Sequence, residues 1–186
     1  MLGALLLSIE YREIRINELH PNMLQYFNRY QVITKDWVSE NDKYILVSNP
    51  HIENWNEKKK IKKVGTVFES LIINNGALFG AFDDEKLIGF SGIDGLLMGS
   101  EQQYLELVEL HVSYEYRGKG IGKNLFKLCV DKAIKYECKK LYIVGSSSEE
   151  SQKFYHKMGC IEAMELIPHL FDESPSDVHM EYVLKE

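Results

Sequence analysis

The stretch of this sequence with the clearest chemical meaning is Tyr116-Arg117-Gly118-Lys119-Gly120-Ile121-Gly122-Lys123. It places three glycines within five residues, directly before a segment with the apolar pattern of a helix. Glycine lets a backbone approach a ligand closely, and the free N–H groups at the start of a helix attract negative charge. The residue types and their spacing therefore predict an anion-binding loop, with phosphate as the natural ligand.

Three phosphate-binding patterns compete for this stretch. A P-loop requires G-x-x-x-x-G-K-[ST], but Arg117 takes the first glycine position and Asn124 the hydroxyl position. The dinucleotide pattern G-x-G-x-x-G also fails, because neither possible placement puts a glycine third. The spacing matches R-x-x-G-x-G, formed by Arg117, Gly120 and Gly122. A nucleotide-binding module remains an alternative that rests on the glycine turn alone.

The segments on either side of the turn predict how it is held. Residues 104–112 are rich in Leu and Val and indicate a strand, and residues 141–145 indicate a second, fully apolar strand. The helix between them is apolar over a wide face, as expected for a helix that packs on a sheet. Because a strand, turn, helix and strand follow one another here, the two strands must run parallel.

Hydrophobic patterning predicts the remaining elements. We expect strands at 11–16, 77–82, 87–94, 161–167 and 178–184, helices within 23–39, at 52–73 and at 149–158, and an acidic loop at 168–177. The sequence thus predicts one α/β domain over residues 1–186 with a mixed sheet. The lysine run at 58–63 is interpreted as a solvated helix face, with an anion contact as the alternative.

Length, charge and cysteine usage narrow the class of protein. The chain has 186 residues, of which 45% are apolar and 27% charged, as in an ordinary one-domain globular protein. A net charge of −6 argues against general binding of nucleic acid, whose phosphates are neutralised by Lys and Arg. The three cysteines form no CxxC pair, which predicts no metal site and favours a reducing cytoplasm.

Membrane insertion and secretion are not expected. No apolar stretch approaches the roughly 20 residues that cross a bilayer. The apolar run Leu5-Leu6-Leu7 is short, has no Lys or Arg before it and is soon followed by Glu10, so it does not predict a signal peptide.

Two blocks of the sequence together resemble the GNAT superfamily of acyl-CoA-dependent N-acyltransferases. Residues Leu110 to Gly122 are similar to that family's strand, turn and pyrophosphate-binding loop, and Ser151 to Cys160 to its late helix with a Phe-Tyr…Gly ending. The resemblance implies a GNAT fold: a single-domain, mixed and mostly antiparallel sheet with helices on both faces. It is best over residues 77–184, which leaves 1–76 as an N-terminal strand and helices on the acceptor side.

The resemblance also implies an activity and a cofactor. Such an enzyme transfers an acetyl group from acetyl-CoA to a primary amine of a small molecule or peptide, by direct attack through a tetrahedral intermediate. Dimers are common in the family, so a homodimer is possible. By position in the family's motif, the residues expected to bind the cofactor are Leu110, His111, Val112, Arg117, Gly118, Lys119, Gly120, Ile121, Gly122, Lys123 and Ser148. Ser148 stands where family members often have Asn.

Three side chains are candidates for the proton transfers. Tyr155 matches the family's general acid, and a phenol with a pKa near 10 stays protonated at neutral pH. Glu106 and Glu109 are candidate bases on the strand before the turn, although a regular strand would put them on opposite faces. A β-bulge, common here in the family, would change that assignment. The side chain of His111 is a weaker candidate base, and its expected role is a backbone contact.

Two other functions stay open at this level. A CoA-binding sensor would keep the cofactor loop and catalyse little, while an antibiotic-modifying acetyltransferase would use the same chemistry on a particular acceptor. The presence of Tyr155 and Glu106 favours an enzyme over a sensor. The acceptor itself has no motif in this sequence.

Overall fold

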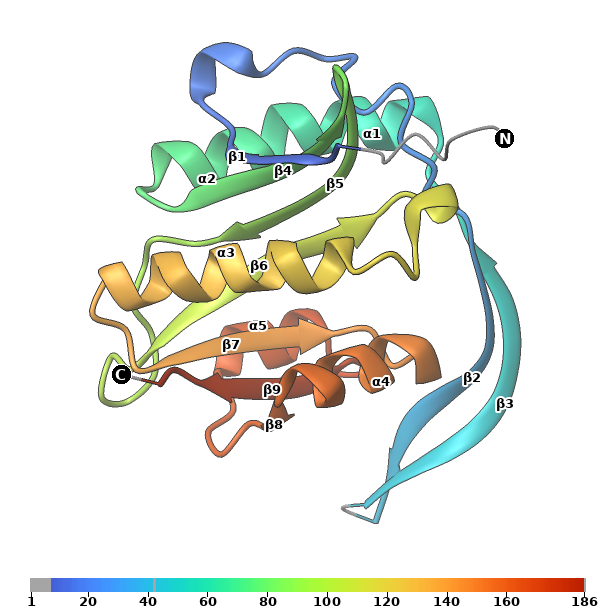
Figure 1. Cartoon of the computed structure of the whole chain (residues 1–186). Coiled ribbons are helices and arrows are strands. Elements are labelled where there is room, and N and C mark those ends of the chain that lie inside the picture. Colours follow the sequence, from blue (N-terminus) through green and yellow to red (C-terminus); the bar gives the residue numbers. More distant parts are fainter. Residues whose placement is uncertain (1–7, 42, 186) are drawn as a thin grey trace, which may run out of the picture.

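The computed structural model describes residues 8–41 and 43–185, and it has a seven-stranded sheet at its centre (Figure 1). In spatial order the strands are β1 (Glu10–Glu13), β4 (Ala77–Asp83), β5 (Lys86–Ile93), β6 (Tyr104–Val112), β7 (Lys140–Gly145), β9 (Val178–Val183) and β8 (Ile161–Glu162). Among the described residues β6 and β7 pair in parallel, and the other neighbours pair antiparallel. The predicted mixed, mostly antiparallel sheet is confirmed.

Helices cover both faces of the sheet, as predicted. On one face lie α3 (Ile121–Lys135) and α4 (Glu149–Met158), and Leu125 of α3 packs against Leu105 and Leu107 of β6. The other face carries α1 (Glu57–Lys63), a π-helical segment (Val64–Phe68), α2 (Glu69–Ile73) and α5 (Pro168–Glu173). There Phe68 packs with Phe90 of β5, at 4.8 Å between ring centroids. Figure 1 shows the two layers on either side of the strands.

The predicted helix within residues 23–39 is wrong. Its second half forms β2 (Gln31–Glu40), which pairs antiparallel with β3 (Lys43–Glu53) in a separate two-stranded hairpin. Val32, Ile33 and Val38 are β-branched residues that suit a strand, and pairing with β3 decides the outcome. The helix expected from residue 52 begins only at Glu57, because Asn56 caps it by accepting a hydrogen bond from the backbone N–H of Lys59 at 2.8 Å.

The hairpin of β2 and β3 reaches across to the far end of β7 (Figure 1). The backbone N–H of Trp37 donates to the carbonyl of Ser147 at 2.8 Å, in the turn that leads from β7 into α4. The hydroxyl of Ser147 also donates to the buried carboxylate of Asp36, at 3.3 Å. The N-terminal part of the chain is therefore attached to the C-terminal part at the start of α4.

Smaller differences concern the C-terminal third and the ends of the chain. The strand predicted at 161–167 extends only over Ile161–Glu162, and residues 168–173 of the predicted loop form α5, which starts with Pro168 in its first turn. The apolar run Leu5-Leu6-Leu7 lies outside the described residues. None of the described helices has the length and apolar character that spanning a membrane requires.

Candidate active site

The glycine turn forms an open cradle at the start of α3. Gly118 and Gly120 have φ angles of 75° and 82°, which residues with a side chain rarely adopt, and a Cβ at either would meet no atom within 4 Å. Gly120 directly precedes the 15-residue helix α3, whose first N–H groups have no partner within the helix. An open loop of free N–H groups at a helix N-terminus fits a pyrophosphate group.

The other residues predicted for this loop divide into surface and internal ones. Lys123 is exposed, and the Lys119 ammonium lies 5.0 Å from the ring centre of Tyr116. Ile121 is buried in the core, and Gly122 lets Phe154 of α4 pack closely. Arg117 braces the turn from inside, since its Nε donates to the carbonyl of Val112 at 3.0 Å. Of these residues, only Lys119 and Lys123 have side chains that are free to contact a ligand.

The strands β6 and β7 separate next to this cradle. Their pairing covers Tyr104↔Lys140, Leu105↔Leu141 and Glu106↔Tyr142 and then ends, although β6 continues to Val112 (Figure 1). Alternate residues of β6 bond to β5, and the N–H of Ser113 bonds the carbonyl of Ile88 at 2.8 Å. The backbone groups of Leu110 and Val112 therefore face the gap, whereas the backbone of His111 faces β5.

A β-bulge in β6 brings the polar side chains together. The pairing with β5 shifts register between Gly92↔Glu109 and Ile93↔Leu107, which leaves Val108 as an extra residue. Because two residues instead of one now lie between Leu107 and Leu110 on the α3 face, Glu109 and His111 move to the face that carries Glu106. The opposite-face arrangement of a regular strand does not occur, and the family's bulge is present.

Glu106 lies on this face without a cationic partner among the described residues. Burial raises its pKa to about 7, and the nearby carboxylates of Asp94, Glu173 and Glu109 contribute further. Asp94 follows β5, and Glu173 is the last residue of α5, so two different parts of the chain bring negative charge to Glu106. A carboxyl with a pKa near neutrality can accept a proton at physiological pH.

Glu109 is paired on both sides. Its Oε1 contacts the ammonium of Lys63, and its Oε2 lies 2.9 Å from Nε2 of His111. Burial acts to raise the pKa of Glu109, but the hydrogen bond from His111 and the charges of His111 and Lys63 outweigh it and hold the pKa below the usual value. Glu109 thus stays ionised and is committed to its partners.

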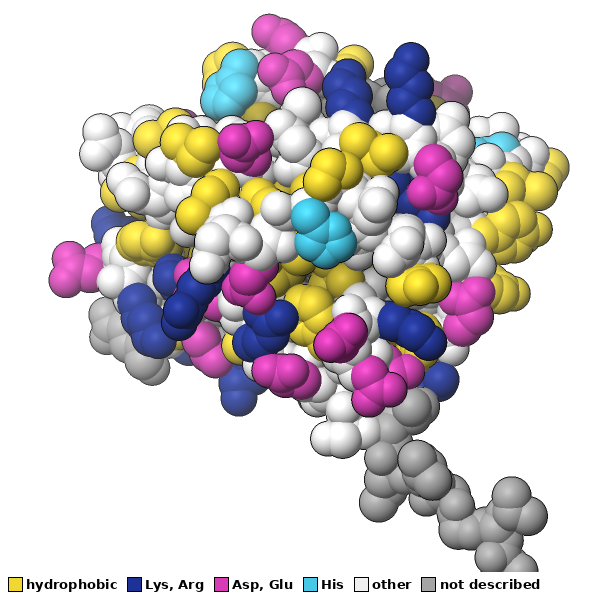
Figure 2. Space-filling view, turned by 90° about the horizontal axis from the view of Figure 1, so that it is seen from above, with side chains coloured by type: hydrophobic (Ala, Val, Ile, Leu, Met, Phe, Trp, Pro, Cys, Tyr) yellow, Lys and Arg dark blue, Asp and Glu magenta, His cyan; other side chains and the backbone are white. Residues whose placement is uncertain are grey.

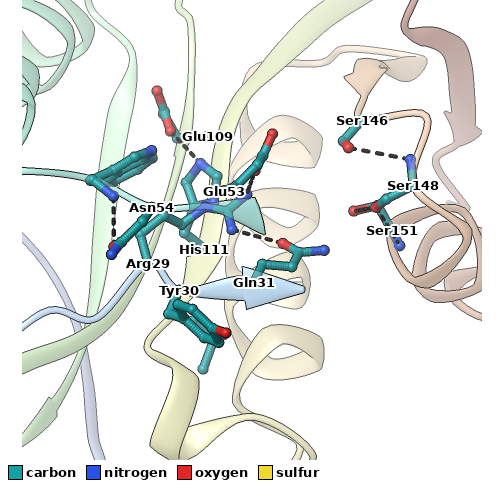
Figure 3. A network of polar contacts seen from close by, with 12 residues as sticks. Arg29, Tyr30, Gln31, Glu53, Asn54, Glu109, His111, Ser146, Ser148 and Ser151 are labelled. Carbon is teal, nitrogen blue, oxygen red and sulfur yellow. Dashed lines mark hydrogen bonds and ion pairs between the residues drawn. The ribbon is translucent and has the colours of Figure 1, made fainter. Parts of the chain in front are cut away.

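Three residues around Glu109 and His111 were not predicted from the sequence. They are Arg29, Trp55 and Lys63. Arg29 is buried and donates to Glu53 at 2.6 Å and to Gln31 at 2.7 Å (Figure 3). Lys63 belongs to the lysine run that was interpreted as solvated, yet its side chain is only 14% exposed. The only sequence signal that could have set Lys63 apart from the other lysines was its position at the end of the helix. In the structure it is the last residue of α1, and its side chain turns inward.

The side chain of Tyr155 approaches the gap from the α4 layer. Its ring packs against Gly145 at the end of β7, where a Cβ would lie 3.2 Å from it. Burial raises the pKa of Tyr155, and the charges of Cys160 and of Glu109 add to this effect. Tyr155 remains a protonated hydrogen-bond donor at neutral pH.

Ser148 is the cap of α4 in this structure. Its hydroxyl accepts from the backbone N–H of Ser151 at 3.3 Å and donates to the Ser151 hydroxyl at 2.8 Å (Figure 3). The residue is fully buried. Its predicted contact with the cofactor stays a prediction.

A family model described as the acetyltransferase (GNAT) family matches residues 35–160 of the chain. The chain belongs to this family. It is therefore an acetyl-CoA-dependent acetyltransferase. A search of the curated proteins finds no match.

Solved structures of GNAT enzymes share the fold of this acetyltransferase. Nourseothricin acetyltransferase matches with a TM-score of 0.70 and 16% identity, over 96% of this chain and 99% of that one. A structure assigned as a streptothricin acetyltransferase from Bacillus anthracis, in complex with acetyl coenzyme A, matches at 0.69 and 15%, with the same coverage. PaiA N-acetyltransferase from Thermoplasma acidophilum, with coenzyme A, matches at 0.59 and 19%, over 95% and 99%.

The raised pKa of Glu106 makes a prediction about stability. Since the pKa in the folded acetyltransferase is about 7 against 4.5 for the free side chain, ionised Glu106 opposes folding, and stability is lost as pH rises between these values. Glu106→Gln should increase the free energy of unfolding at pH 8 by roughly 1–3 kcal/mol and change it little at pH 4.5. Urea denaturation at both pH values measures this difference.

The matched control is Glu85→Gln, in the exposed turn between β4 and β5. It should show no such dependence on pH. An equal effect of Glu106→Gln at both pH values would contradict the unpaired, half-buried environment of Glu106.

Proposed function

We propose that this acetyltransferase acts on a primary amine of a small cationic molecule or peptide, with Glu106 as the base and Tyr155 as the proton donor. The observation that carries the proposal is the environment of Glu106. It is a half-buried carboxyl with a pKa of about 7 on the open face of β6, with the carboxylates of Asp94, Glu173 and Glu109 nearby. A base poised near neutrality is what an amine acceptor requires, because most amines are protonated at physiological pH.

Each step has a residue suited to it. Acetyl-CoA supplies the acetyl group and a thiolate as leaving group. The N–H groups of the turn from Gly118 to Lys123 hold its pyrophosphate, and the backbone of Leu110 and the N–H of Val112 in the gap orient the thioester. Backbone donors aimed at a developing negative charge are worth roughly 3 kcal/mol each. Glu106 takes the proton of the amine, and the phenol of Tyr155 donates a hydrogen bond to the departing sulfur.

A cationic acceptor fits the charges on this face. Asp94, Glu106 and Glu173 converge from three segments, and an ammonium group would be stabilised between them. Cationic antibiotics are one candidate class, because the proteins of two similar structures are described as nourseothricin and streptothricin acetyltransferases. On the surface seen in Figure 2, by contrast, acidic and basic side chains are interspersed. We also propose a cytoplasmic location, consistent with three buried free thiols.

A screen of amine acceptors tests the activity directly. The enzyme is incubated with acetyl-CoA and lysine, spermidine, nourseothricin or an amino-terminal peptide, and the release of free CoA thiol is followed. We expect release with at least one polycationic amine and less release with neutral amines of the same size. Binding of acetyl-CoA without release on any amine would instead support the CoA-binding sensor.

Substitution in the cradle tests the assignment of the cofactor loop. Gly120→Glu places a side chain and a negative charge where the pyrophosphate is expected, and it should abolish binding of acetyl-CoA in isothermal titration. Gly120→Ala is the control for backbone strain at a φ of 82°, which costs about 1–2 kcal/mol. If Gly120→Glu bound acetyl-CoA as tightly as Gly120→Ala, the assignment would be wrong.

Removal of one hydroxyl tests the role of Tyr155. Tyr155→Phe should lower kcat roughly 100-fold, at the small end of proton-transfer effects because a thiolate already leaves well. The Kd for acetyl-CoA should change little. The control is Tyr182→Phe, whose ring lies against Gly159 at the C-terminal end of α4. A kcat equal to that of the control would leave Tyr155 with a packing role only.

A further inference from the structure

A chain of three polar side chains links α1 to the open face of β6. Lys63 contacts Oε1 of Glu109, and Oε2 of Glu109 lies 2.9 Å from Nε2 of His111. The ring of Trp55 packs against both ends, with its centre 4.8 Å from the Lys63 ammonium and 4.9 Å from the centre of the His111 ring. The side chains of Lys63 and Glu109 are 14% and 8% exposed, whereas His111 is 24% exposed. The chain therefore runs from a buried pair to a partly open imidazole.

We propose that His111 binds the acceptor amine through Nδ1, and that Lys63 and Glu109 are positioning residues that hold its ring in the required tautomer. This inference rests on the proposed function, because it concerns the amine that Glu106 deprotonates. His111 is thereby given a side-chain role, in place of the backbone contact expected from the sequence.

The tautomer follows from the contact with Glu109. An ionised carboxylate only accepts hydrogen bonds, so Nε2 of His111 must carry a proton and donate it (Figure 3). In a neutral imidazole Nδ1 then carries the lone pair. Within residues 8–41 and 43–185 no hydrogen bond is made to Nδ1, and it is not among the fully buried polar atoms that lack a partner. Nδ1 is thus left as a free acceptor atom on a partly exposed ring.

The groups around the ring decide its charge. Its own strand contributes Glu109, α1 contributes Lys63, and the segment before β2 contributes Arg29, while Trp55 and Phe90 supply apolar contact. Burial lowers the pKa of His111, Glu109 opposes this, and the charges of Arg29 and Lys63 lower it further. The ring is therefore neutral at neutral pH. It accepts a hydrogen bond from the amine, and the proton itself goes to Glu106.

Kinetics of three variants test the proposal, with the fastest acceptor among lysine, spermidine and nourseothricin as the probe. His111→Gln should raise KM for the amine roughly tenfold, the worth of one hydrogen bond, with little change in the Kd for acetyl-CoA. Lys63→Met should raise the same KM at pH 6, where the ring gains a proton and repels the ammonium. KM should recover toward the wild-type value at pH 8.5.

Matched variants separate positioning from simple packing. Lys63→Arg keeps the charge and should behave as wild type, and Lys62→Met, exposed on the same helix, should leave KM unchanged at both pH values. A KM for Lys63→Met that is raised equally at pH 6 and 8.5 would overturn the positioning role. An unchanged KM in His111→Gln, with an active wild type, would overturn the amine contact.

The ring can also be observed without any acceptor. Nitrogen-15 NMR of the histidines should show His111 with a protonated Nε2 and an unprotonated Nδ1, and its pKa should rise in Lys63→Met. The opposite tautomer would overturn the inference even if the acetyltransferase activity is confirmed. Failure of the proposed function is a different outcome, because it would appear as a wild type that acetylates no amine.

Discussion

The early end of pairing between β6 and β7 is the constraint on which the rest of the site depends. Parallel strands normally continue side by side, and an unpaired buried backbone group costs about 1–3 kcal/mol. Here the strands part after Glu106↔Tyr142, and the backbone of Leu110 and the N–H of Val112 are left facing a gap, while the Val112 carbonyl already accepts from Arg117. A ligand with its own donors and acceptors can satisfy those groups. Tyr155 comes from α4 to the end of β7 at this gap, where its ring packs against Gly145.

Two carboxylates three residues apart on β6 illustrate how partners set the charge in this site. Glu106 is half-buried and Glu109 is buried, yet the pKa of Glu106 is raised to about 7 and that of Glu109 is lowered. Desolvation acts on both in the same direction, so the difference comes from Lys63 and His111, which contact only Glu109. The bulge places both side chains on one face of β6. This strand thus carries a permanently ionised carboxylate, Glu109, next to a carboxyl that can accept a proton near neutral pH, Glu106.

The sequence predicted the glycine turn and the strand and helix beside it well because their signals are local. Glycines at positive φ, a helix start and a strand before them lie within about twenty residues, and Gly118 and Gly120 are found as expected. The hairpin of β2 and β3 was missed because its strands are stabilised by each other and by Ser147, far along the chain. Lys63 looked like one of several solvated lysines, and only the folded position of Glu109 gives it a different role.

The two halves of the site therefore come from segments under different constraints. The donor side uses backbone groups of one turn and one gap, which tolerate little change in sequence. On the proposed acceptor side, side chains from α1, Trp55, Arg29 and α5 lie around β6. Replacing Arg29, Lys63 or Glu173 alters the charge around Glu106 or His111, and none of these three residues belongs to the cradle. Specificity for the amine can consequently change while the glycine motif and the fold remain the same, which is why the motif identifies the donor and not the acceptor.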